Sequence, residues 1–146
     1  MISFSVLGIA QSAGSKHALP FKRKDGRLGV AVSDDNPRLK DWKAVVAWSA
    51  REAVGSGFVP LRCALEVEFT FYRVRPRGHF RKDGTLSKVG VAMSYPITRP
   101  DATKLMRAAE DSLTGIIWRD DSQLVTQRAL KRWGEVPSVE IRVMEL

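Results

Sequence analysis

The clearest pattern in the chain is the alternation of side-chain types over residues 61–72, which is typical of a β-strand with one buried face. The apolar side chains that point to one side are Leu61, Cys63, Leu65, Val67, Phe69 and Phe71. The side chains that point the other way are Arg62, Glu66, Glu68 and Tyr72. A strand of this kind belongs in a sheet with a second layer over its apolar face.

The remaining segments predict the rest of this fold. The expected further strands are Ile2–Ile9, Gln123–Arg132 and Ser138–Val143. The expected helices run from Pro37 to about Val54 and over about Asp101–Thr114, and each is followed by a glycine. In the second helix, helical spacing predicts a buried stripe of Leu105, Ala109 and Leu113. We therefore predict a single α+β domain over residues 1–146, with a small mixed sheet and two main helices packed on it.

Composition excludes several classes of protein. The chain has 146 residues, of which 44% are hydrophobic and 27% charged, so it can bury a core without disulfides or metal. The only cysteine, Cys63, is expected to be a small core side chain, and with His17 and His79 distant from it we predict no zinc site. No apolar run is long enough to span a membrane and no secretory signal is visible, so we expect a cytoplasmic protein.

The positive charge of the chain is concentrated in two segments. The net charge is +8, and residues 14–29 hold five Lys/Arg against one Asp while residues 73–99 hold seven against one. An Asp-Gly pair in each segment, at 25–26 and at 83–84, favours a hairpin turn; the first pair suits a two-residue turn. The cations expected to bind DNA phosphates are Lys16, Lys22, Arg23, Lys24, Arg73, Arg75, Arg77, Arg81, Lys82 and Lys88. The alternative is that both segments are simply solvated loops.

Carboxylates gather around the second predicted helix, and two interpretations of them stay open. If the ends of the helix converge at one edge of the sheet, Asp101 and the pair Asp120-Asp121 make a site for Mg²⁺, which prefers oxygen ligands. Otherwise Asp101 is an N-cap, Asp111 forms an i,i+4 ion pair with Arg107, and Asp120-Asp121 is a polar turn.

The same segment resembles the signature of the RusA family of Holliday-junction resolvases. The family pattern is roughly P-D-x-D-N-L-x-K, then D-A-L-x-G, then W-x-D-D-x-Q-V. The matching residues here are Pro100, Asp101, Leu105, Asp111, Leu113, Gly115, Trp118, Asp120, Asp121 and Gln123, with Arg107 at the position of the lysine.

The resemblance implies a homodimeric endonuclease of a bacterial or phage-infected host cell that uses Mg²⁺, or Mn²⁺ in its place. Its substrate is a four-way DNA junction, in which it makes paired cuts in opposing strands. Asp101 and Asp121 match the catalytic, metal-binding aspartates. Asp120, which lies beside Asp121, and Asp111 are the further candidate metal ligands. Arg107 stands where the family has a functional lysine, and Lys104 is expected to help it stabilise the phosphoryl charge.

Two departures from the pattern matter for the metal site: Thr103 stands at the second aspartate of P-D-x-D, and Lys104 stands at the asparagine. A threonine offers only a neutral oxygen, so a metal site loses one negative charge. Either Asp111 or Asp120 makes up the ligand set, or Lys104 binds the scissile phosphate instead, or the chain binds junctions without cutting them. The last possibility gives the alternative function, a non-catalytic branched-DNA-binding protein.

Overall fold

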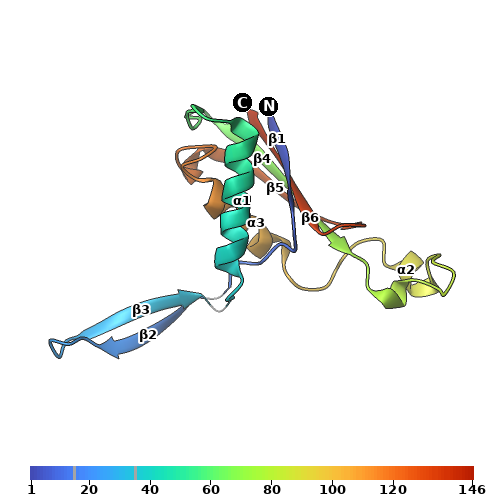
Figure 1. Cartoon of the computed structure of the whole chain (residues 1–146), viewed down its shortest axis with the longest axis horizontal. Coiled ribbons are helices and arrows are strands. Elements are labelled where there is room, and N and C mark those ends of the chain that lie inside the picture. The colour runs from blue at the N-terminus through green and yellow to red at the C-terminus, as the bar shows by residue number, and fades with distance from the viewer. Residues whose placement is uncertain (15, 35) are drawn as a thin grey trace.

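A four-stranded mixed sheet with helices on one face forms the body of the molecule (Figure 1). The computed structural model describes residues 1–14, 16–34 and 36–146, and for residues 16, 17 and 32–34 it describes the backbone alone. The strands are β1 (Ile2–Leu7), β4 (Leu65–Val74), β5 (Leu124–Gly134) and β6 (Ser138–Glu145), in the order β1-β6-β4-β5. Strands β4 and β5 are parallel and the other pairs are antiparallel. The predicted α+β class is confirmed.

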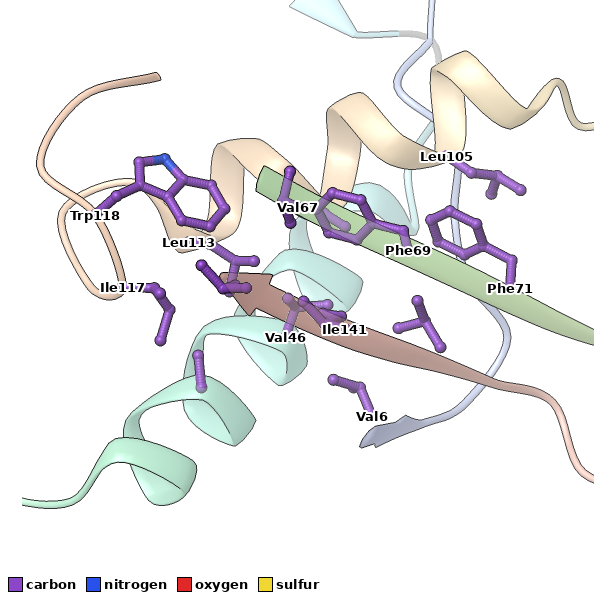
Figure 2. Packing of buried hydrophobic residues seen from close by; sticks show 14 of the residues in the cluster. Val6, Val46, Val67, Phe69, Phe71, Leu105, Leu113, Ile117, Trp118 and Ile141 are labelled. Atoms are coloured by element: carbon purple, nitrogen blue, oxygen red, sulfur yellow. The ribbon is translucent and has the colours of Figure 1, made fainter. Parts of the chain in front are cut away.

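Two helices, α1 (Leu39–Val54) and α3 (Ala102–Leu113), cover the apolar face of this sheet. Figure 2 shows side chains of both helices meeting those of β1, β4 and β6 in one continuous core. The largest fully buried side chains include Trp118, Phe69, Phe71, Leu65, Leu105 and Leu113. Each helix is followed by a glycine with positive φ, Gly55 at 75° and Gly115 at 79°, as the sequence predicted.

The predicted strand over 61–72 begins only at Leu65, because residues 61–64 bind a different part of the chain. Leu61 exchanges backbone hydrogen bonds with Ile117 and Arg119, at 2.9 and 3.1 Å. Cys63 is therefore partly buried at the edge of the core rather than inside it, and its Sγ lies 3.4 Å from a carboxylate oxygen of Glu145.

The first basic segment is a hairpin that projects from the body (Figure 1). It consists of β2 (Lys16–Lys22) and β3 (Leu28–Asp34), paired antiparallel, and we call it the hairpin arm. The predicted two-residue turn is wrong: residues 23–27 form the connection, where the Arg23 N–H donates to the Arg27 carbonyl at 2.8 Å. Gly26 takes a φ of 83° there, which a glycine adopts without strain.

The second basic segment is folded and forms a small lobe (residues 75–95) beside the sheet. It contains the 3₁₀ turn η1 (Arg77–His79), a tight turn at Asp83-Gly84 as predicted, and the short helix α2 (Lys88–Ala92). Helix α2 packs on the backbone of η1 so closely that a Cβ at Gly90 would lie 2.2 Å from the carbonyl oxygen of His79. None of the described helices is long and apolar enough to cross a membrane.

Candidate functional site

An open groove of about 570 Å³ lies at the N-terminal end of α3, and Asp101 and Lys104 line it. Arg38, at the start of α1, and Arg99 contribute its other charged side chains. Residues 9–14, which lead into the hairpin arm, line the groove as well, and there the Ala13 N–H donates to the Lys104 carbonyl at 3.0 Å. We call this site the α3 groove. It places three cations beside one carboxylate.

The carboxylate of Asp101 is left available for a ligand. Asp101 occupies the N-cap position of α3, as predicted, with extended backbone angles. Its side chain accepts no hydrogen bond from the first turn of the helix, however, so the interpretation of this carboxylate as a cap is wrong. The side chain is exposed, and no described side chain caps the first-turn N–H groups, which point toward an anion or water in the groove.

Two cations hold the segment that carries Asp101 into the groove. Lys131 Nζ donates to the carbonyls of Thr98 and Pro100, at 2.8 and 3.1 Å, and Arg73 donates to the carbonyl and hydroxyl of Thr98, both at 3.2 Å. Desolvation and the charge of Arg73 lower the pKa of Lys131, and the charge of Asp101 opposes them. The Arg99–Pro100 peptide bond is cis. Arg73, predicted to bind DNA, thus holds the backbone of the site.

At the opposite end of α3, Asp121 is fixed by two donors. Its Oδ1 accepts from the Thr114 hydroxyl and, at 2.8 Å, from Nε1 of the buried Trp118. Glu110 lies close by: desolvation and then the charge of Asp121 raise the pKa of Glu110, and a hydrogen bond from Gln127 opposes the rise.

Sequence reasoning did not single out Glu110. The available signal was its place three residues before Leu113, at the margin of the predicted buried stripe.

The other two predicted carboxylates have structural partners. Asp120 accepts from the Ser122 N–H at 2.8 Å and caps the 3₁₀ turn η2 (Asp121–Gln123), and this contact with Ser122 lowers the pKa of Asp120. Asp111 forms an ion pair with Lys43 of α1, at 2.8 Å. The predicted ion pair between Asp111 and Arg107 is therefore wrong.

Asp101 and Asp121 do not converge within one chain. The whole of α3 separates them, which at 1.5 Å per residue is about 20 Å. Figure 2 shows Leu105 and Trp118, which lie near the two ends of this helix, on opposite sides of the core. Ligands of one Mg²⁺ each lie about 2 Å from the ion, so they stand within about 4 Å of each other. The predicted meeting of both carboxylates at one sheet edge is wrong for a single protomer.

Each end of α3 nevertheless carries carboxylate oxygens that can bind Mg²⁺. This ion is often held by one or two carboxylates together with water and substrate phosphate. Asp101 offers one carboxylate beside cations that attract phosphate, while Asp121 and Glu110 offer a pair. Within the described part of the chain, no three His, Cys, Asp or Glu residues are grouped closely enough to hold a metal ion.

The predicted DNA-binding cations separate into exposed ones and two with structural contacts, Arg73 at Thr98 and Arg75 in the lobe. The exposed ones in described positions are Lys22, Arg23 and Lys24 of the hairpin arm and Arg77, Arg81, Lys82 and Lys88 of the lobe, and on α3 Arg107 is exposed as well. The side chain of Lys16 lies outside the described residues. Arg75 instead donates to the carbonyls of Gly90 and Met93, at 2.8 and 3.1 Å, and its guanidinium lies 5.2 Å from the ring centre of Trp133. Arg75 holds the lobe together.

Comparison with known proteins agrees with the resemblance in the α3 segment. A protein of Bacillus subtilis (strain 168) named "Uncharacterized protein YqaN" is 25% identical over 146 residues, which is 99% of this chain and 96% of that protein. The sequence model of the family "Endodeoxyribonuclease RusA" matches residues 20–144, a range that includes both main helices, strands β4 and β5, nearly all of β6 and the charged side chains of the α3 groove. The chain therefore belongs to the RusA family of endodeoxyribonucleases.

Proposed function

We propose that this protein is a Mg²⁺-dependent endodeoxyribonuclease that resolves four-way DNA junctions by paired hydrolysis of opposing strands. The observation that carries the proposal is the α3 groove. There the carboxylate of Asp101, which forms no capping hydrogen bond with α3, shares the lining with Arg38, Arg99 and Lys104. The hairpin arm and the lobe project on either side of the N-terminal end of α3 (Figure 1). Each carries exposed cations. Membership of an endodeoxyribonuclease family supports the same reaction.

Asp101 and Asp121 are the residues proposed to hold Mg²⁺, with Glu110 beside Asp121. Bound Mg²⁺ supplies an activated water and neutralises charge on the phosphate. Lys104 and Arg107, one turn apart on the exposed side of α3, stabilise the negative charge that develops on the phosphoryl oxygens.

The separation of the two aspartates gives the proposed homodimer a chemical role. If Asp101 binds the same ion as an Asp121, the second residue is Asp121 of the partner subunit, since its own lies about 20 Å away along α3. A two-fold dimer then carries two equal sites, which matches two cuts in a junction of near two-fold symmetry. The arms and lobes hold the DNA through its phosphates and shape rather than through base edges.

One observation favours a second candidate, a junction-binding protein without cleavage. Thr103 is exposed one helical position before Lys104, where the family pattern has an aspartate, and a hydroxyl adds no negative charge for a metal. The basic surface of the hairpin arm and lobe does not depend on that residue, so DNA binding persists under either function.

A cleavage assay on matched substrates separates the two functions. A synthetic four-way junction and a linear duplex of the same sequence are incubated with the protein in Mg²⁺, Mn²⁺ or EDTA, with Asp121→Asn as the inactive variant. Metal-dependent nicks in the junction, absent from the duplex and from the variant, support the endonuclease. Tight junction binding without nicks in either metal contradicts it and leaves the binding protein.

A further inference from the structure

We infer that Arg38 binds a DNA phosphate in the α3 groove, so that the start of α1 takes part in substrate binding. This inference rests on the proposed function. Arg38 lies outside both basic segments and outside the α3 motif, and the fold alone brings it to Asp101.

The side chain of Arg38 is free to bind a ligand. It is exposed, and although Arg38 occupies the N-cap position of α1, its side chain forms no capping hydrogen bond. No described residue forms a hydrogen bond or an ion pair with its guanidinium. The contacts that fix Arg38 are made by its backbone: its N–H donates to Asn36 Oδ1 at 3.1 Å, and its carbonyl accepts from the Trp42 N–H at 3.1 Å. Contacts from described residues therefore hold the backbone of Arg38 and leave its guanidinium available.

The charge of the groove selects an anion. Among the described residues that line the groove, Arg38, Arg99 and Lys104 face one carboxylate, Asp101, so these four side chains have a net charge of about +2 at neutral pH. The uncapped first turn of α3 adds the positive end of a helix dipole. A phosphodiester matches this site because a guanidinium donates two parallel hydrogen bonds to phosphate oxygens.

The position of Arg38 also links the groove to the hairpin arm. Asn36 donates from Nδ2 to the Ser12 carbonyl at 3.0 Å, which ties the start of α1 to the chain that leads into the arm. A phosphate bound by Arg38 therefore lies between the arm and Asp101. We assign it to the strand that passes from the arm into the cleavage site.

The test compares Arg38→Gln with Arg51→Gln, which removes an exposed arginine from the last turn of the same helix, about 20 Å from Arg38. Binding to a four-way junction is measured in EDTA, where no cleavage occurs, over a series of salt concentrations. We expect Arg38→Gln to weaken binding about tenfold at low salt and to reduce the slope of log affinity against log salt by about 0.9 for each lost contact. Arg51→Gln should bind like wild type, and Arg38→Lys should recover part of the slope.

Equal thermal unfolding midpoints of the two glutamine variants show that the comparison is between folded proteins. If Arg38→Gln and Arg51→Gln bind the junction with equal affinity and slope, the inference is wrong, whether or not the wild type cuts DNA. If the wild type cuts nothing but Arg38→Gln alone loses affinity, the proposed cleavage fails and the phosphate contact stands.

Discussion

Mixed dimers of two inactive variants test whether one metal site draws on two protomers. Asp101→Asn and Asp121→Asn each remove one proposed ligand, and helix α3 holds the two positions about 20 Å apart in a chain. If each site combines Asp101 of one protomer with Asp121 of the partner subunit, a mixed dimer has one site with both changes and one site with neither. If each site lies within one protomer, both sites of the mixed dimer are damaged.

The two variants are co-expressed with different affinity tags, and dimers that carry both tags are isolated. Random pairing makes about half of the dimers mixed, and each mixed dimer has one intact site of two. Unfractionated material should therefore contain about a quarter of the intact sites found in the same amount of wild-type protein. Purified mixed dimers should nick only one strand of each junction, because only one of their sites is intact. Paired cuts should be absent.

The matched control is a mixture in which both partners carry Asp121→Asn under different tags, which has no intact site under either arrangement. If doubly tagged Asp101→Asn/Asp121→Asn dimers nick junctions no faster than this control, the shared site is refuted. The two carboxylates would then act on separate ions or in separate steps.

Further substitutions separate structural residues from binding residues. Arg75→Gln should lower the free energy of unfolding by about 2 kcal/mol in chemical denaturation, because two carbonyls of the lobe lose a charged donor. Arg81→Gln, which removes an exposed arginine, should leave stability unchanged and weaken junction binding. Equal stability of the two variants would contradict this assignment. Gly90→Ala should lower the thermal midpoint of unfolding, since its Cβ would lie 2.2 Å from the His79 carbonyl oxygen, and an unchanged midpoint would show that the lobe packs differently. The raised pKa of Glu110 means that the native state holds this proton more tightly than the unfolded state, so stability is lost as pH rises from about 4.3 through the native pKa. Glu110→Gln in EDTA should therefore match wild type near pH 3.5 and unfold at a higher temperature at pH 7; a variant that is less stable at pH 7 would refute the sign.

The fold could be predicted from local patterns where burial repeats regularly along the chain. The alternation of Leu65, Val67, Phe69 and Phe71 and the terminating glycines of both helices have local causes, and the structure has these elements in the expected places. The start of β4 could not be predicted because residues 61–64 bind a loop more than fifty residues later in the sequence. The 73–99 segment appeared to be an open connection, since nothing local shows that Arg75 bonds the carbonyls at its far end.

Local sequence patterns propose some residues of the candidate site but do not give its geometry. The motif selects Asp101 and Asp121, yet a spacing along the chain does not say whether the ends of a helix fold toward each other, and here they do not. Asp111 forms its ion pair with Lys43 rather than with Arg107 because α1 packs against α3, and these two helices are distant in the sequence. Arg38 could not be found from sequence for the same reason: it lines the same groove as Asp101 only because α1 packs against α3.

Paired cleavage is tested most directly by mapping the cut positions in a four-way junction labelled in turn on each of its four strands. In Mg²⁺, the wild-type protein should nick one pair of opposing strands at symmetric positions, leaving products that ligate into linear duplexes. EDTA or Asp101→Asn should abolish both nicks while junction binding persists. Nicks that fall on a single strand, or cleavage that survives Asp101→Asn, would contradict the proposed mechanism.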